Sequence, residues 1–256
     1  MIRTETHQGV ARLILARPEK KNAFNGEMLQ AIDRAVAAWG ADPAVRVIVV
    51  QADGETFCAG ADLAWMAQYA DADRATNVQS ARDLGGVFHR IAKAPKPVVG
   101  RIQGAARGGG VGLAAAVDIA IASDRATFAL TEVRLGLLPG VISPFVVERV
   151  GPSRARQLFM TGETVSAVDA ERWGLVHACV PHDDLDARVD AVVAQLVQGG
   201  PEALLACKQL VDVVAFQPSH AVFDQTAELI ADRRVSTEAQ EGMVAFLTRR
   251  KAGWVP

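Results

Sequence analysis

The chain has 256 residues, half of them hydrophobic, and a formal net charge of −2. A chain of this length can bury a full hydrophobic core. Its Lys and Arg residues are scattered and form no basic stripe of the kind that binds a phosphate backbone, so we expect no nucleic-acid partner. The sequence also has no stretch of about 18 apolar residues, and we therefore expect no membrane association and a cytoplasmic location.

Strand patterns and helix patterns alternate through the first half of the chain. The two N-terminal strands meet at a short turn that ends in Gly9, which predicts a hairpin. Asn25 is a good cap for the helix that follows, whose apolar residues recur at helical spacing. Strands are predicted at 2–6, 10–15, 45–50, 97–102, 118–122 and 127–130, and helices after Asn25, Leu63 and Gly110.

One unit of a buried strand, a glycine-containing loop and a helix occurs twice. Its loops are ADGETFCAGADL at 52–63 and QGAARGGG at 103–110. Parallel neighbouring strands need helical crossovers, so this repeat predicts an α/β core with largely parallel strands.

The second half of the chain, from Ser153, is predicted to be mostly helical, with one short strand at 176–180. Further helical patterns begin at Leu185, Glu202, Ala221 and Thr237. No Pro/Gly/Ser linker separates the halves, so we predict a single domain over 1–256. Its core would end near residue 190, and the helices of 191–256 would pack on the core or on a neighbouring subunit.

The cysteines and histidines form no metal-ligand pattern. Cys58, Cys179 and Cys207 are widely spaced without a CxxC pair, and the five histidines form neither HxxxH nor HExxH. We expect no metal and no disulfide framework, and we interpret the cysteines as small buried hydrophobic residues.

Both glycine loops lead into a helix N-terminus, where the first backbone N–H groups have no partner within the helix. Gly and Ala let a ligand approach these groups without meeting large side chains. Segments 58–62 and 108–112 could therefore direct two backbone donors at one negatively charged oxygen. The alternative, in which the glycines serve close packing of helix on strand, stays open at this point.

A dinucleotide site is a competing interpretation of the second loop. Residues 110–115 fit GxGxxA, and Glu132 follows about 20 residues later, as in that motif. However, a loop of residues 103–109 separates these glycines from their strand, and Glu132 precedes a Gly/Pro turn instead of ending a strand. The context disfavours nucleotide binding.

Five segments together resemble the enoyl-CoA hydratase/isomerase (crotonase) superfamily, in family order and at family spacing. They are RPEKKNAF (17–24), FCAGADL (57–63), KPVVGRIQGAARGGGVGLA (96–114), DIAIAS (118–123) and FALTEVRLGLLPG (128–140). The resemblance covers nearly the whole chain. It implies an α/β crotonase (ClpP/crotonase-like) fold, with a superhelical core of repeated ββα units and a C-terminal helical region.

The resemblance also implies roles for individual residues. The backbone N–H groups of Ala61 and Gly109 would hold a thioester oxygen, and Glu132 would be the acid/base. Coenzyme A is part of the substrate in this family, so no separate cofactor is expected. The residues expected to contact the CoA thioester are Lys20, Lys21, Ala23, Ala59, Asp62, Leu63, Trp65, Gly108, Phe246 and Lys251. Phe246 and Lys251 would complete the pocket, often from a neighbouring subunit, which implies a homotrimer or a dimer of trimers.

One expected carboxylate is missing. Hydratases of this family usually carry a second glutamate after the GGG loop, and that position is Gly112 here. Three functions therefore stay open: hydration of a 2-enoyl-CoA by Glu132 alone, double-bond isomerisation by Glu132, and acyl-CoA binding without catalysis. The wider pattern most resembles bacterial 3-methylglutaconyl-CoA hydratase-like members, which favours hydration and places the protein in leucine degradation or fatty acid metabolism. Arg107 or His89 could then pair with a distal carboxylate, but a solvated or core role is the preferred interpretation of each. Trp65, Met66 and Tyr69 would line the acyl pocket or, alternatively, form a stripe of the core.

Overall fold

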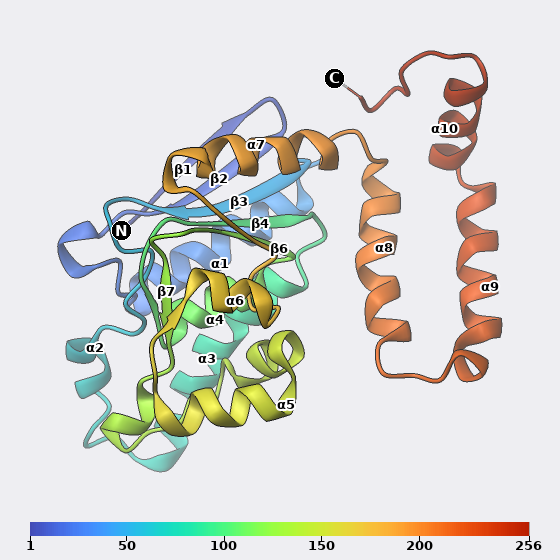
Figure 1. Ribbon diagram of the computed structural model, residues 1–256. Coiled ribbons are helices and arrows are strands. Elements are labelled where there is room, and N and C mark those ends of the chain that lie inside the picture. The colour runs from blue at the N-terminus through green and yellow to red at the C-terminus, as the bar shows by residue number, and fades with distance from the viewer. Residues whose placement is uncertain (256) are drawn as a thin grey trace.

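A six-stranded sheet forms the centre of the computed structural model, which describes residues 1–255 (Figure 1). Only the first two strands pair antiparallel, and every later neighbour pairs parallel, as the repeat of strand, loop and helix predicts. In spatial order the strands are β1 (Ile2–His7), β2 (Val10–Leu15), β3 (Val47–Ala52), β4 (Val98–Ile102), β6 (Ile119–Ser123) and β9 (Ala178–Val180).

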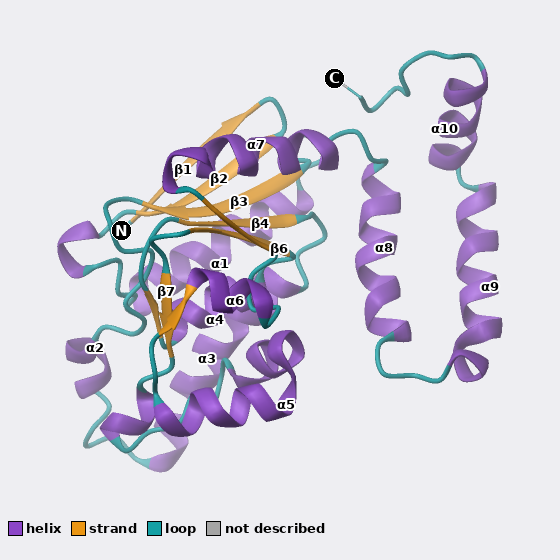
Figure 2. Cartoon of the chain, in the orientation of Figure 1, coloured by secondary structure: helices purple, strands orange, loops and turns teal. Residues whose placement is uncertain are grey.

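A second, smaller sheet lies beside the first (Figure 2). Its strands are β5 (Ala106–Arg107), β7 (Thr127–Ala129) and β8 (Val165–Ser166). The chain passes from β4 through β5 into α4 (Gly109–Ala116), and then from β6 through β7 toward α5 (Ser143–Thr161). Each pass is a ββα unit, so the two sheets grow together as the chain winds.

Alternating side chains of the central strands build two cores. Ile48 and Val50 of β3 face a large core, while Val47 and Val49 face a smaller one. This division follows from the period of two in a strand. The helices of the larger core include α1 (Gly26–Ala41), α3 (Arg74–Ala92) and α4, and the smaller core is closed by α7 (Leu185–Leu196).

The last three helices form an arm that stands away from the core, on the side of the molecule opposite to the short helix α2 (Leu63–Ala67) (Figure 1). The arm consists of α8 (Pro201–Val214), α9 (Ser219–Val235) and α10 (Thr237–Leu247). Neither α8 nor α9 contains a buried residue. The predicted boundary at residue 190 falls inside α7, so the arm itself begins at Pro201.

The structure differs from the sequence prediction in its irregular segments. Strand β3 begins at Val47, two residues later than expected. The two-residue strands β5 and β8 were not predicted, because a pair of residues shows no periodicity. Helix α5 begins at Ser143, ten residues before the expected start, and is interrupted at Gly151, where φ is 72°. The Gly-Pro pair at this interruption explains why the helical pattern in the sequence begins only at Ser153.

No helix within residues 1–255 is long and apolar enough to cross a membrane. The same part of the chain contains no group of three or more His, Cys, Asp or Glu side chains arranged to hold a metal ion.

Candidate active site

The N-terminus of α4 is shaped by glycines that no other residue could replace without movement. Gly108 has φ 48°, and its N–H donates to the Ala129 carbonyl at 2.9 Å. A methyl group on Gly109 would lie 2.2 Å from Cζ of Phe24, far inside the normal carbon contact distance. The start of the helix therefore packs directly on an aromatic ring and is fixed in place.

The loop that carries Ala61 is held from both sides. Phe24 donates its N–H to the Gly60 carbonyl, and Asp62 donates its N–H to the Phe24 carbonyl, both at 2.9 Å. Gly60 has φ 87°, and a Cβ there would lie 2.8 Å from the Arg107 carbonyl oxygen. The loop thus lies against the second glycine loop, at a distance that only glycine allows.

The two predicted donors have no protein acceptor and belong to residues that line one cavity. Within the described chain, neither the Ala61 N–H nor the Gly109 N–H donates a hydrogen bond to a protein acceptor. Both residues line the same cavity of about 260 Å³. Two unpartnered backbone donors at one cavity can stabilise a negatively charged oxygen.

Glu132 lines the same cavity, at the start of the 3₁₀ helix Glu132–Leu135. Its Oε1 would lie 3.1 Å from a Cβ on Gly108, so the carboxylate is next to the residue that precedes Gly109. Its Oε2 is buried and has no hydrogen-bond partner among residues 1–255. Burial raises the pKa of Glu132 above its ordinary value of 4.5, which suits a group that takes and returns a proton.

Hydrocarbon groups make up most of the remaining wall. An apolar wall lowers the local dielectric constant, which strengthens the two N–H donors and disfavours an isolated charge. The apolar residues are Phe24, Leu63, Met66, Leu84, Leu135, Leu137, Leu138, Pro139, Val141 and Ile142.

Apolar side chains fill the space around Gly112, the position where the second carboxylate is missing. Gly112 is buried in α4, and a Cβ there would lie 2.3 Å from Cγ2 of Ile142 and 3.3 Å from Cε1 of Phe88. The space that a second glutamate would need is therefore occupied by other side chains.

Several of the residues expected to bind CoA lie in or beside the cavity. Ala59, Leu63 and Gly108 line it. Lys20 and Lys21 are exposed on the neighbouring segment, where the Lys21 carbonyl accepts the Ala59 N–H at 2.9 Å.

Two further expected CoA contacts are tied to Arg17. Its Nη1 donates to the Ala23 carbonyl at 2.7 Å, and its Nη2 lies 3.2 Å from a carboxylate oxygen of Asp62. Asp62 also caps α2 by accepting the Ala64 N–H at 3.0 Å. These contacts order the segment, and the CoA contacts themselves stay predictions.

The expectation that Trp65 and Tyr69 line the acyl pocket is not met by the structure. Their rings contact each other at 5.7 Å, and both residues line a different cavity together with Gly26. Met66 does line the site. Adjacent residues of a helix point about 100° apart, so Trp65 and Met66 cannot both face the same side of α2.

The remaining predicted residues lie outside the cavity or are engaged elsewhere. Phe246 is 84% exposed on α10, and Lys251 is exposed in the segment after it, so both belong to the remote arm (Figure 1). Arg107 lines the cavity, but its guanidinium donates to the Thr127 carbonyl and hydroxyl at 2.8 and 2.9 Å. His89 lines another cavity, between α1 and α3.

Asn22 is a site-organising residue that the sequence analysis missed. It is fully buried with φ 55°, and its amide donates to the carbonyls of Asp53 and Thr56, both at 2.8 Å. Its Oδ1 accepts the Arg17 N–H at 2.9 Å. Asn is the residue that most readily adopts positive φ after Gly, and this preference is the signal that could have identified it.

The fold and the site together define an α/β protein that can hold a thioester oxygen on two backbone donors beside a buried carboxylate. The enoyl-CoA hydratase/isomerase family pattern matches residues 5–255. A crotonyl-CoA hydratase of Syntrophomonas wolfei is 33% identical over 98% of this chain and 96% of its own length. A trans-2-decenoyl-acyl-carrier-protein isomerase of Streptococcus mutans is 33% identical over 95% and 93%, respectively.

The structure of an enoyl-CoA hydratase from Shewanella pealeana matches with a TM-score of 0.95 at 35% identity, over 99% of this chain and 95% of that chain. This protein belongs to the enoyl-CoA hydratase/isomerase family and is an enzyme of that family. The predicted crotonase fold is confirmed.

Proposed function

We propose that this enzyme adds water to a 2-enoyl-CoA thioester, with Glu132 as its only carboxylate acid/base. The observation that carries this proposal is the buried carboxylate of Glu132, whose Oε2 has no partner among residues 1–255, in the same cavity as two backbone donors without protein acceptors. A solvated or ion-paired glutamate would have neither a raised pKa nor an oxygen without a partner.

In the proposed reaction, Glu132 takes a proton from a water molecule, and the water oxygen forms a bond to the β-carbon. The electron pair of the double bond moves toward the thioester oxygen, which accepts hydrogen bonds from the N–H groups of Ala61 and Gly109. Return of the proton from Glu132 to the α-carbon completes the addition of one water. Because the charge on the oxygen grows during the reaction, the donors stabilise the transition state more than the substrate.

The cavity supports a short acyl group. Its volume of about 260 Å³ is below the range of roughly 300–1,000 Å³ usual for ligand pockets. We propose short branched 2-enoyl groups, with 3-methylglutaconyl-CoA as the first member to assay, because the sequence pattern resembles hydratases of that kind. Arg107 would have to release Thr127 before it could pair with a distal carboxylate.

Isomerisation is a second candidate function, and Gly112 supports it. Moving a double bond between the α,β and β,γ positions needs one base that removes a proton from one carbon and returns it to another. The closed space beside Gly112 leaves Glu132 as the single base of the cavity. A related protein of Streptococcus mutans is named an isomerase.

The two reactions are distinguished by the absorbance of the conjugated enoyl thioester. We expect the enzyme to remove this absorbance from crotonyl-CoA and from 3-methylglutaconyl-CoA by hydration. A gain of absorbance from a 3-enoyl-CoA, without loss from the 2-enoyl substrates, would instead establish isomerisation. Tight binding of the thioesters with no change in either assay would establish a binding protein and contradict both enzymatic proposals.

We also propose that the protein acts as a homotrimer or a dimer of trimers. The arm exposes large apolar side chains that a subunit interface would cover, and Phe246 and Lys251 could reach a CoA site only on another copy. The mass of the protein in solution, measured by light scattering, tests this. A monomer at micromolar concentration would contradict it.

A further inference from the structure

Ile142 separates the active-site cavity from Gly112. Its side chain is 2% exposed and lines the cavity, whereas Gly112 lies behind it in α4. Ile142 stands at the start of α5, and its carbonyl accepts the Val146 N–H at 3.2 Å. The first turn of α5 therefore fixes where this side chain points.

The space between Ile142 and Gly112 is too small for any added side chain. A Cβ on Gly112 would lie 2.3 Å from Cγ2 and 2.9 Å from Cβ of Ile142, whereas carbon atoms pack favourably at about 3.5–4.0 Å. Cβ of Ile142 is attached directly to the backbone, so rotation of the side chain cannot remove the second contact.

Phe88 closes the other side of Gly112. Its ring carbon would lie 3.3 Å from the added Cβ, and the residue is fully buried. Its ring also packs against the rings of Phe24 and Phe145, with centroids 6.1 and 6.3 Å away. Phe88 therefore cannot move away from an added side chain at position 112 without displacing a neighbouring ring.

We propose that Ile142 keeps this enzyme dependent on a single carboxylate, because it occupies the volume that a side chain at position 112 of α4 would need. Gly112 and Ile142 compete for the same space, so a side chain at one of these positions excludes a side chain at the other. The cavity wall at Ile142 is apolar as a result, and all proton transfer falls to Glu132. The catalytic part of this inference rests on the proposed function, whereas the packing part does not.

A thermal double-mutant cycle tests the packing part without any assay of activity. We expect Gly112→Ala to lower Tm by about 4–8 °C, since overpacking of a core costs that much in a chain of this size. In the Ile142→Gly background, the same change at Gly112 should cost less than half as much. Equal losses in the two backgrounds would overturn the proposal. If Ile142→Gly fails to fold, Ile142→Ala serves as the background, and its smaller relief is measured in the same way.

A matched pair of double variants tests the catalytic part with crotonyl-CoA as the probe. Gly112→Glu/Ile142→Gly and Gly112→Gln/Ile142→Gly place groups of equal size at the vacated position, and only the first can ionise. We expect hydration by the Glu variant to be at least about tenfold faster than by the Gln variant, with an additional ionisation in its pH profile. Equal rates and identical pH profiles, with the wild type active, would overturn the proposal. A wild type without hydratase activity contradicts the proposed function instead, and the thermal cycle then decides the inference alone.

Discussion

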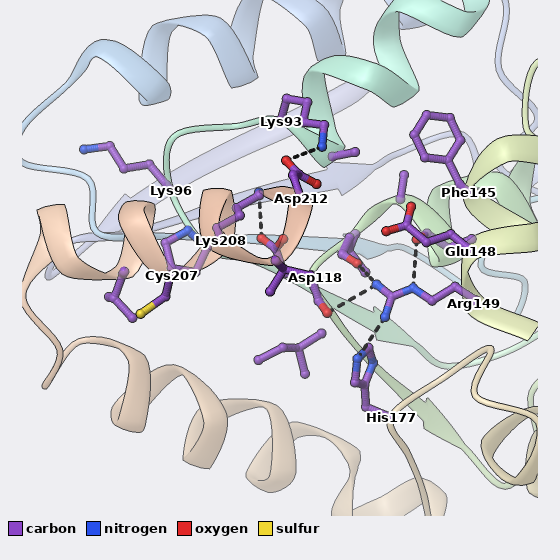
Figure 3. A pocket seen from close by; sticks show the side chains of 18 of the residues that line it. Lys93, Lys96, Asp118, Phe145, Glu148, Arg149, His177, Cys207, Lys208 and Asp212 are labelled. Carbon is purple, nitrogen blue, oxygen red and sulfur yellow. Dashed lines mark hydrogen bonds and ion pairs between the residues drawn. The ribbon is translucent and has the colours of Figure 1, made fainter. Parts of the chain in front are cut away.

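The active-site cavity and a larger cavity under the arm differ in how their charged groups are satisfied. The active-site cavity contains one buried carboxylate oxygen, Oε2 of Glu132, with no protein partner among residues 1–255. The other cavity, of about 590 Å³, lies between α8 and the core. There Lys208 pairs with Asp118 at 2.8 Å and Lys93 with Asp212 at 2.6 Å (Figure 3).

The ion pairs of the cavity under the arm and the carboxylate oxygen of Glu132 without a partner serve different purposes. Figure 3 shows Lys208 and Asp118 pointing toward each other across the space between the arm and the core. Asp118 also accepts the Val98 N–H at 2.7 Å, so this carboxylate joins α8 to the first residue of β4. The two ion pairs under the arm join α8 to the core, whereas Oε2 of Glu132 has no partner among residues 1–255.

The largest effect should follow from Glu132→Gln. We expect the hydration rate to fall by about 10²–10⁴-fold, because an amide cannot accept the proton, while the dissociation constant of a CoA thioester stays within a few-fold of wild type. Steady-state kinetics and calorimetry measure the two quantities. The exposed Glu27→Gln is the matched control and should have no effect. A near-normal hydration rate of Glu132→Gln would show that this carboxylate has no catalytic role and that the two cavities do not differ in this respect.

The next effect should follow from Asp118→Ala, which leaves Lys208 without its partner and Val98 without its acceptor. We expect the free energy of unfolding to fall by about 1–3 kcal/mol, with little change in the activity of the folded enzyme. The control is Asp212→Ala, which removes a half-exposed ion pair and should cost no more than about 1 kcal/mol. Chemical denaturation compares them. Equal losses of unfolding free energy in the two variants would show that the burial of the ion pair under the arm does not affect its contribution to stability.

The smallest effect concerns stability and pH. The pKa of Glu132 is raised by burial, so between its ordinary value of 4.5 and its raised value the folded state binds more protons than the unfolded state. This residue therefore lowers the free energy of unfolding as the pH rises through that interval. The variant Glu132→Gln has no titrating group at this position, so its free energy of unfolding does not fall in this way as the pH rises.

The Tm of Glu132→Gln minus that of wild type should consequently become more positive as the pH rises above 4.5. Differential scanning calorimetry at several pH values measures this difference. A constant difference, or one of opposite sign, would mean that the carboxylate is solvated in the folded protein and that the comparison of the two cavities is wrong.

Regular elements and backbone donors could be predicted because their causes are local. The apolar run that ends in Val50 predicts a buried strand, and the Asn25 cap is present, with its side chain accepting the Met28 N–H at 3.0 Å. Gly and Ala before a helix predict only that segments 58–62 and 108–112 could present accessible N–H groups. The particular pair, Ala61 and Gly109, is implied by the resemblance to the crotonase superfamily.

The rest of the site depends on contacts between distant segments. Nothing near Gly112 in the sequence shows that Ile142 fills the space beside it, because the two meet only when α4 and α5 pack. The orientation of α2 likewise decides that Met66 faces the cavity and Trp65 does not. The position of the arm could not be predicted either, since its apolar faces fit the core and a neighbouring copy equally well.

The side chain of Arg46 holds both flanks of the arm at one point beside the sheet. Its guanidinium donates to the carbonyls of Gly199 and Trp254, both at 2.7 Å, and these acceptors lie just before and just after the three helices of the arm. Arg46 directly precedes β3, so one residue at the start of a central strand anchors the arm by two hydrogen bonds. Replacement of this one side chain would release the arm at both of its flanks.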